Sequence, residues 1–215
     1  KALDNPYLSK LIEQLSVFTE RYGKYSRRPE YNGAWANFCI LRGWNRWDEL
    51  GANNAIPFSR ADSFAPILSG EAFSVLQRYG LEKKLFFTMH AGGDARYYPN
   101  GVGGKIWPAD CWAEFCRLCK QEYPDIPVVQ LGSDQAFAIP NADICLAGKI
   151  TLQEAAILLK QAQIHIDGES GLVHLRRQLR KQSVVLFGPT PLEYYGYAQN
   201  HNIPSPICGN CMWVT

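Results

Sequence analysis

Two glycine-bearing loops carry most of the side chains that could do chemistry. The first runs from His90 to Pro108 and contains Gly92, Gly93 and Lys105. Glycines let backbone N–H groups approach an anion, the helix opened by Pro108 offers its positive end, and Lys105 adds a charge. No Gly-Lys-Ser/Thr sequence opens that helix, so this is not a Walker loop, and the dinucleotide fingerprint is not matched either. The loop suits a diphosphate; a plain mobile surface loop is the alternative.

The second segment runs from Asp167 to His174 and joins an apolar strand to a helix. Glu169 precedes the helix, and His174 lies about one turn inside it. A carboxylate here can accept hydrogen bonds from sugar hydroxyls, while an imidazole can donate to a phosphate oxygen. Gly171 lets a ligand approach the backbone. The alternative is a capped helix with a packed histidine.

Two further segments are weaker signals on their own. Residues 146–152 (Leu-Ala-Gly-Lys-Ile-Thr-Leu) indicate a strand, a turn and a helix whose capping box pairs Thr151 with Glu154. Residues 187–191 (Phe-Gly-Pro-Thr-Pro) indicate a strand that ends in a sharp turn.

Strands and helices alternate from Lys84 onward. Strands are expected at residues 85–89, 128–131, 144–146, 164–167 and 184–187, and helices at 69–79, 108–123, from 152 onward and 170–179. The expected apolar face of the third of these helices holds Leu152, Ala155, Ala156 and Leu159. Continuous apolar strands separated by helices predict an α/β fold, a doubly wound Rossmann-like parallel sheet with its ligand crevice at the carboxyl ends of the strands.

The first 80 residues differ from the rest. Residues 6–22 have the apolar spacing of an amphipathic helix, and residues 25–58 are rich in aromatic residues without a clear period. We therefore expect residues 1–80 to be a helical and irregular appendage, the tail of a preceding domain with a linker. Residues 81–215 are the expected Rossmann-like domain.

Composition excludes several classes of protein. The 215 residues are 47% hydrophobic with a net charge of +2, and basic residues are mixed with acidic ones, which argues against a nucleic-acid partner. No apolar run approaches the roughly 20 residues of a membrane span, and the first residues do not look like a secretory signal. Cytoplasm is the expected compartment.

The seven cysteines are an odd number, which argues against a complete set of disulfides. Most are expected to be reduced and buried, with Cys116 and Cys119 in the core. Cys208 and Cys211 form a CxxC pair, which supplies two of the four ligands that zinc or iron sites need. A structural metal in the intact protein would need partner cysteines elsewhere.

Taken together and in order, four segments resemble the C-terminal, donor-binding domain of GT-B glycosyltransferases of family 9, the heptosyltransferases. The matching positions are Lys105 with Trp107 and Pro108, residues 146–152, residues 169–175 (Glu-Ser-Gly-Leu-Val-His-Leu) and residues 187–190. The resemblance covers about residues 84–200.

The resemblance implies a donor site for a nucleotide sugar. Its implied pyrophosphate ligands are Gly92, Gly93 and Lys105. The residues implied to face the sugar and its phosphate are Glu169, Ser170, Gly171 and His174. The base and ribose are implied to lie against Gly132, Ser133, Asp134, Lys149, Ile150 and Thr151. Glu169 replaces the more usual aspartate, which lengthens the arm toward the sugar.

The implied function is an inverting transfer of a heptose-like sugar from an ADP donor to a lipopolysaccharide or protein acceptor, with at most peripheral contact at the inner face of the membrane. The chemistry requires no cofactor, and the general base is expected in an N-terminal domain. Two alternatives stand beside it. One is a GT-B-type nucleotide-sugar epimerase or hydrolase, which needs carboxylates around the sugar; the other is a non-catalytic nucleotide-binding module.

Overall fold

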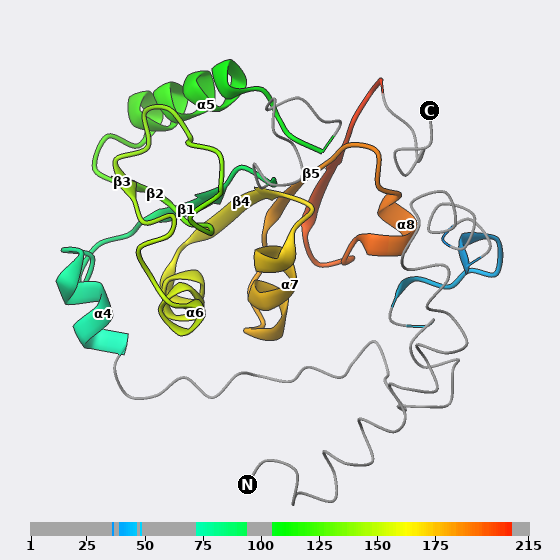
Figure 1. Cartoon of the computed structure of the whole chain (residues 1–215), viewed down its shortest axis with the longest axis horizontal. Helices are drawn as coiled ribbons and strands as arrows, with labels where there is room; N and C mark the ends of the chain where they lie inside the picture. Colours follow the sequence, from blue (N-terminus) through cyan, green and yellow to red (C-terminus); the bar gives the residue numbers. More distant parts are fainter. Residues whose placement is uncertain (1–35, 37–38, 47, 49–71, 94–104, 208–215) are drawn as a thin grey trace, which may run out of the picture. The chain divides into compact units, whose positions relative to one another are not determined.

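The computed structural model describes residues 36, 39–46, 48, 72–93 and 105–207. Within them the strands form one parallel sheet in the order β3-β2-β1-β4-β5-β6 (Figure 1). The strands are β1 (Phe87–His90), β2 (Val128–Gln130), β3 (Ile144–Cys145), β4 (Ile164–Gly168), β5 (Val184–Phe187) and β6 (His201–Pro204). The predicted doubly wound α/β fold is confirmed.

Helices of the sheet unit cover both faces of the sheet, whereas the short α8 (Leu192–Tyr195) belongs to a second compact unit. The helices of the sheet unit are α4 (Ala72–Arg78), α5 (Ala109–Glu122), α6 (Leu152–Gln161) and α7 (Gly171–Gln178). In Figure 1, α5 lies on one face, and α6 and α7 lie on the other. None of the helices in the described part of the chain is long and apolar enough to cross a membrane.

Each face has its own apolar core. Under α5, a cluster of buried residues includes Met89, Trp112, Cys116, Val128 and Ile166. Under α4 and α6, a second cluster includes Leu76, Val129, Leu131, Leu158 and Leu159. Neighbouring strand residues contribute to opposite clusters because successive side chains of a strand point to opposite faces.

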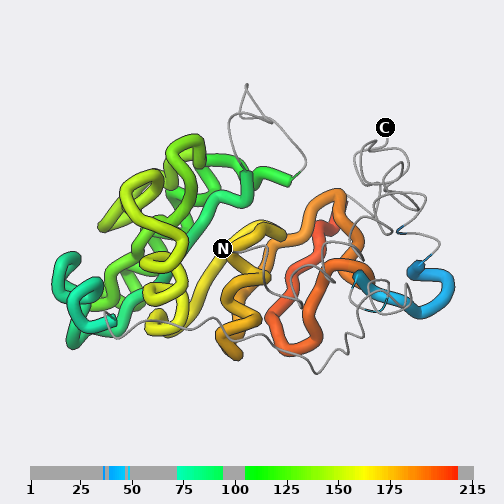
Figure 2. Tube along the Cα trace, turned by 60° about the horizontal axis from the view of Figure 1, so that its bottom comes forward, coloured from blue at the N-terminus to red at the C-terminus, as the bar shows by residue number. Residues whose placement is uncertain are grey.

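The strand order reverses between β1 and β4, the two central strands. From β1 the chain proceeds outward through β2 to β3, and from β4 it proceeds outward through β5 to β6. Figure 2 follows this path, with the yellow β4 between the green and the orange-to-red parts of the sheet. His90 is in register with Asp167. The loops that follow β1 and β4 therefore start side by side, at the point where open α/β sheets bind ligands.

Most element positions agree with the sequence expectations to within about two residues. Thr151 forms the expected capping box at the start of α6, and Gly80 has the positive φ of +66° expected after a helix. One detail of α6 was wrong: Leu152 is 70% exposed, because it lies in the first turn on the solvent side. The elements α8 and β6 were not expected.

Arg176 of α7 is buried, and in the described part of the chain its side chain bonds to backbone carbonyl groups. Its guanidinium and Nε donate to the carbonyl oxygens of Leu159, Ala162, Gln163 and Gln182. Burial lowers the pKa of Arg176 to about 10. This side chain joins the end of α6 and the segment before β5 to α7, and so fixes the helix that carries His174.

The chain divides into two compact units. The sheet unit comprises Ser63–Gly188 and Tyr197–Ile207. The other unit comprises Lys1–Asp62, Pro189–Gly196 and Cys208–Thr215, and within it Ala36, Cys39 and Tyr194 form a small apolar cluster. The predicted domain division at residue 80 stays a prediction, and the predicted helix at residues 6–22 lies outside the described residues.

The described cysteines are reduced thiols, as expected. Cys116 and Cys119 are buried on α5, Cys39 is buried in its cluster, and Cys145 is exposed. Cys208 and Cys211 lie outside the described residues.

Candidate functional site

Two glycines bring the loops after β1 and β4 into close contact. A Cβ atom on Gly92 would lie 3.1 Å from Cα of Gly168 and 3.3 Å from the carbonyl oxygen of Lys105. Gly92 also has a φ of +78°, which residues with a side chain rarely adopt. A Cβ on Gly168 would lie 3.1 Å from Cα of Gly92 and 3.4 Å from the carbonyl oxygen of Lys105. Glycine is therefore required on both sides of this approach.

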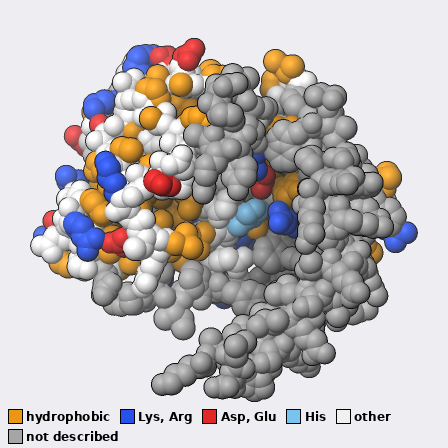
Figure 3. Space-filling view, viewed as in Figure 1, with side chains coloured by type: hydrophobic (Ala, Val, Ile, Leu, Met, Phe, Trp, Pro, Cys, Tyr) orange, Lys and Arg blue, Asp and Glu red, His pale blue; other side chains and the backbone are white. Residues whose placement is uncertain are grey.

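Lys105, Glu169 and His174 meet beside these glycines. Lys105 Nζ lies 2.6 Å from Glu169 Oε2, and His174 Nε2 lies 3.3 Å from Glu169 Oε1. The Glu169 side chain is only 6% exposed, whereas those of Lys105 and His174 are 18% and 31% exposed. The space-filling view shows a histidine side chain at the surface next to acidic and basic ones (Figure 3). The nearly buried carboxylate of Glu169 thus contacts the nitrogen atoms of Lys105 and His174, whose side chains are more exposed than its own.

The electrostatics of Glu169 favour its charged form. Burial raises the pKa of Glu169, but the hydrogen bond from His174 and the charge of Lys105 outweigh this effect and lower the pKa to about 2. At neutral pH the cluster therefore contains a carboxylate held by hydrogen bonds from both neighbours.

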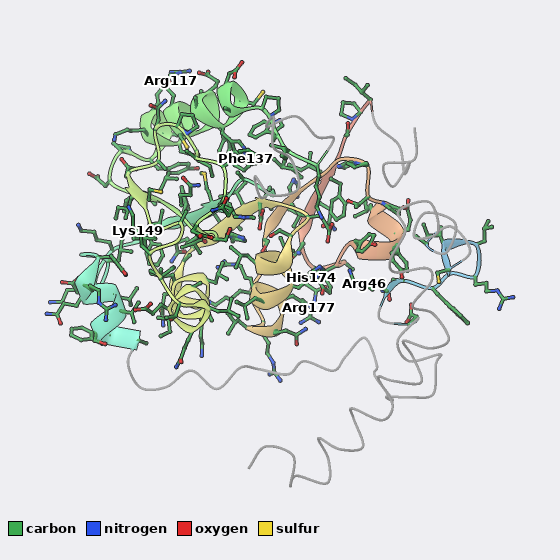
Figure 4. All side chains as sticks on the ribbon, viewed as in Figure 1. Arg46, Arg117, Phe137, Lys149, His174 and Arg177 are labelled. Carbon is green, nitrogen blue, oxygen red and sulfur yellow. The ribbon has the colours of Figure 1, made fainter. Side chains whose placement is uncertain are left out.

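Tyr197 extends the cluster on the side of His174 away from Glu169. Its hydroxyl oxygen lies 2.7 Å from His174 Nδ1, and the two rings meet edge to face with centroids 5.5 Å apart. His174 and Arg177 lie one turn apart on α7 (Figure 4), and the guanidinium of Arg177 lies 5.8 Å from the centroid of the Tyr197 ring. Sequence reasoning missed Tyr197, which lies between α8 and β6.

A second carboxylate, Asp167, is fully buried beneath the cluster. It lies 2.9 Å from His90 Nδ1 and 3.1 Å from His165 Nε2, and it accepts a hydrogen bond from the Ser170 hydroxyl. Burial raises the pKa of Asp167, but the charge of His90 and the hydrogen bond from His165 lower it to about 2. The sequence analysis assigned no role to Asp167.

Ser170 combines two structural roles. It is the N-cap of α7, where its hydroxyl accepts from the Leu172 backbone N–H at 3.2 Å, and it donates to Asp167. The buried Asp167 network therefore fixes the start of the helix that carries His174.

The predicted base and ribose region forms a second group of adjoining turns. The Gly148 N–H donates to the Gly132 carbonyl at 3.0 Å, and a Cβ on Gly148 would lie 2.7 Å from Cα of Asp134. The turn after β2 thus packs against the turn before α6. Two side chains here have local partners: the Ser133 hydroxyl accepts from the Gln135 N–H, and Lys149 Nζ donates to the Cys145 carbonyl.

The structure thus brings the predicted residues into two neighbourhoods. Gly92, Lys105, Glu169 and His174 gather at the central strands, whereas Ser133, Asp134 and Lys149 belong to the adjoining turns after β2 and β3. Their binding roles remain predictions. Within the described ranges, histidine, cysteine and acidic side chains do not gather into a metal-binding group.

Comparison with known proteins finds similarity to one family of glycosyltransferases. Residues 101–207 match the model of glycosyltransferase family 9 (heptosyltransferase). Lipopolysaccharide heptosyltransferase 1 of Campylobacter coli is 29% identical over 138 residues, which cover 57% of this chain and 39% of that protein.

Two solved structures have a similar fold. ADP-heptose lipopolysaccharide heptosyltransferase II of E. coli superposes with a TM-score of 0.55 at 20% identity, over 74% of this chain and 50% of that one. A family 9 glycosyltransferase of Veillonella parvula gives a TM-score of 0.52 at 19% identity, over 71% of this chain and 45% of that one. The chain spans half or less of the length of these relatives. Residues 101–207 are thus similar to glycosyltransferase family 9, and the parallel sheet has the fold of one half of a GT-B structure.

Proposed function

We propose that this chain supplies the donor site of an inverting glycosyltransferase that moves a heptose-like sugar from an ADP donor to an acceptor. The observation that carries the proposal is the convergence of Lys105 and His174 on Glu169, beside the contact between Gly92 and Gly168. Two nitrogen donors at the switch point of a doubly wound sheet suit a phosphate-bearing ligand.

The diphosphate is proposed to bind at the loop after β1. Lys105 offers a charge there, and Gly92 and Gly93, which are buried against neighbouring residues of the protein, are the proposed backbone ligands of the same loop. Because Lys105 is paired with Glu169, the incoming diphosphate replaces the carboxylate as the partner of the lysine. A charge-assisted contact of this kind contributes about 1.5–3 kcal/mol.

The sugar is proposed to lie at the start of α7. Once Lys105 turns to the diphosphate, Glu169 can accept hydrogen bonds from sugar hydroxyls. Ser170 fixes the helix start, and at Gly171 no described atom lies within 4 Å of an added Cβ. His174 Nε2 is proposed to donate to the phosphate next to the sugar.

The base and ribose are proposed to lie against the adjoining turns at Ser133, Asp134, Lys149, Ile150 and Thr151. Adenine is proposed because a solved relative of similar fold is named for ADP-heptose. Lipopolysaccharide is one proposed acceptor, since the relative from Campylobacter coli is a lipopolysaccharide heptosyltransferase; a protein acceptor is the other.

The proposed reaction forms a bond from an acceptor oxygen to the anomeric carbon while the bond from that carbon to the ADP oxygen breaks. The electron pair of the broken bond stays on the diphosphate, so negative charge grows there in the transition state. Lys105 and His174 stabilise that charge. The acceptor proton goes to a general base that we assign to no residue of this chain. The whole protein is proposed to act in the cytoplasm, with peripheral contact at the membrane.

We propose no cofactor for the chemistry. Cys208 and Cys211 could supply two ligands of a structural zinc or iron ion in the intact protein.

A GT-B-type epimerase or hydrolase would need further carboxylates at the sugar. Asp167 has no exposed surface and is held by His90, His165 and Ser170, so among the described residues of the cluster Glu169 is the accessible carboxylate. Incubating the full-length protein with the donor alone separates the transferase from the epimerase or hydrolase, because only an epimerase or hydrolase converts the donor rapidly without an acceptor.

Calorimetry on this chain tests the donor assignment. We expect ADP to bind more tightly than NAD or ATP, because the site is proposed to hold one diphosphate and a sugar. NAD binding as tightly as ADP would refute the proposed site. UDP binding more tightly than ADP would keep the transferase and overturn adenine as the base.

A further inference from the structure

The contacts of His174 depend on a residue from another part of the sheet unit. Nε2 of the imidazole faces Glu169 at 3.3 Å, and Nδ1 faces the hydroxyl of Tyr197 at 2.7 Å. Because Glu169 is a carboxylate, which only accepts hydrogen bonds, Nε2 must carry a proton. In neutral His174, Nδ1 is then the acceptor and the Tyr197 hydroxyl is the donor.

Tyr197 is itself held in place from several sides. It is only 8% exposed, its ring packs edge to face against His174, and Arg177 lies over the ring. The backbone carbonyl of Tyr197 accepts from the Asn200 N–H at 3.0 Å and from the Asn202 side chain at 2.9 Å. The hydroxyl is thus a fixed point against which the imidazole ring can be oriented.

We propose that Tyr197 is a positioning residue of the donor site, whose hydroxyl fixes the ring orientation and tautomer of His174 so that its Nε2–H points toward Glu169 and the bound donor. This inference rests on the proposed function. With the Tyr197 hydroxyl present, rotation of the His174 ring breaks the hydrogen bond at Nδ1. Without the hydroxyl there is no such bond to break, so the ring rotates at a lower energy cost. Fixing the ring in advance lowers the entropy cost of donor binding.

The test compares Tyr197→Phe with the unmodified chain, using Tyr123→Phe as a control. The first variant removes the hydroxyl and keeps the ring between His174 and Arg177. The control removes a hydroxyl from a tyrosine that is 52% exposed and follows α5. Nitrogen-15 chemical shifts of the His174 ring report its tautomer without any nucleotide, and calorimetry reports ADP affinity.

We expect Tyr197→Phe to change the His174 ring shifts and to weaken ADP binding roughly three- to tenfold, as befits one hydrogen bond. The thermal midpoint should change little, and Tyr123→Phe should leave both readouts unchanged. In a His174→Ala background, Tyr197→Phe should have almost no further effect on ADP affinity, because Tyr197 acts through His174.

Two results would overturn the inference. Unchanged His174 ring shifts in Tyr197→Phe would show that the hydroxyl does not orient the ring. An equal loss of ADP affinity with and without His174 would show that Tyr197 acts by another route. If the unmodified chain does not bind ADP, the proposed function fails, and the ring shifts still decide whether Tyr197 orients His174.

Discussion

The side chains of Lys105 and Glu169 form an ion pair with 2.6 Å between Nζ and Oε2, although 64 residues separate them in the chain. One follows β1 and the other follows β4, the strands between which the sheet order reverses. The pair is largely shielded from water, with side chains 18% and 6% exposed. Any anion that uses Lys105 must therefore compete with Glu169, and this competition shapes the predictions for both residues.

Lys105→Ala should weaken ADP binding about ten- to a hundredfold, the value of a charge-assisted hydrogen bond, while adenosine binding stays the same. The variant also leaves Glu169 with His174 as its remaining partner in the cluster, so stability should fall as well. Calorimetry with ADP and adenosine separates these effects. Lys120→Ala is the control, because Lys120 lies in the last turn of α5 and forms an ion pair with Asp143 instead of Glu169. Equal losses for ADP and adenosine would make Lys105 a structural residue.

Glu169→Gln should tighten ADP binding a few-fold and slow turnover of the nucleotide sugar in the full-length enzyme. The amide keeps the shape of the side chain but removes the anion that competes with the diphosphate for Lys105. It also weakens the acceptor that the sugar hydroxyls are proposed to use. ADP titrations and initial rates measure the two effects. A loss of ADP affinity as large as that of Lys105→Ala would contradict the competition and mean that Glu169 holds the lysine in its binding position.

Local sequence signals predicted much of the sheet unit. The apolar strands, the capping box at Thr151 and the glycine after α4 all act over a few residues, so they can be read from the chain. The strand β6 could not be predicted in this way, because its sequence His-Asn-Ile-Pro has one aliphatic side chain and forms the edge of the sheet. The burial of Leu152 was mistaken because periodicity alone does not say that a first-turn position faces solvent.

The site was predictable where its residues are neighbours in sequence. Glu169, Ser170 and His174 share one segment, whereas the contact of His174 with Tyr197 spans 23 residues and a change of element. The hydrogen-bond network of Asp167 has a signal in the sequence of β4. In β4, the sequence Ile164-His165-Ile166-Asp167 alternates apolar and ionisable residues, so one face of a buried strand carries two groups that need partners.

Stability should fall as the pH drops from about 5 toward 2. The folded-state pKa values of Asp167 and Glu169 are lowered to about 2, from ordinary values of 3.8 and 4.5. In this pH range the unfolded chain takes up protons that the folded chain does not, so each group removes up to about 1.4 kcal/mol of stability per pH unit. Burial also lowers the pKa of His165, which acts in the same direction below its ordinary value of 6.5.

Thermal melts between pH 7 and pH 3 check this prediction. Glu169→Gln should show a smaller loss of stability on acidification than the unmodified chain, because one of the titrating groups is gone. Glu122→Gln is the control, since Glu122 is exposed at the end of α5. An unchanged pH dependence in Glu169→Gln would mean that the ion pair with Lys105 does not lower the pKa of this carboxyl group in solution.

Gly171→Ala offers a probe of ligand contact that should not disturb the fold. A Cβ on Gly171 would meet no described atom within 4 Å, and alanine is favoured over glycine in a helix by up to about 1 kcal/mol. The thermal midpoint should therefore stay the same or rise. The proposed sugar and its phosphate lie against this position, so an added methyl group should weaken binding of the nucleotide sugar roughly tenfold and binding of ADP less. Adenosine affinity is the internal control, because the base is proposed to lie at the adjoining turns after β2 and β3. If the nucleotide sugar binds the variant as tightly as the unmodified chain while the midpoint is unchanged, the start of α7 does not contact the sugar.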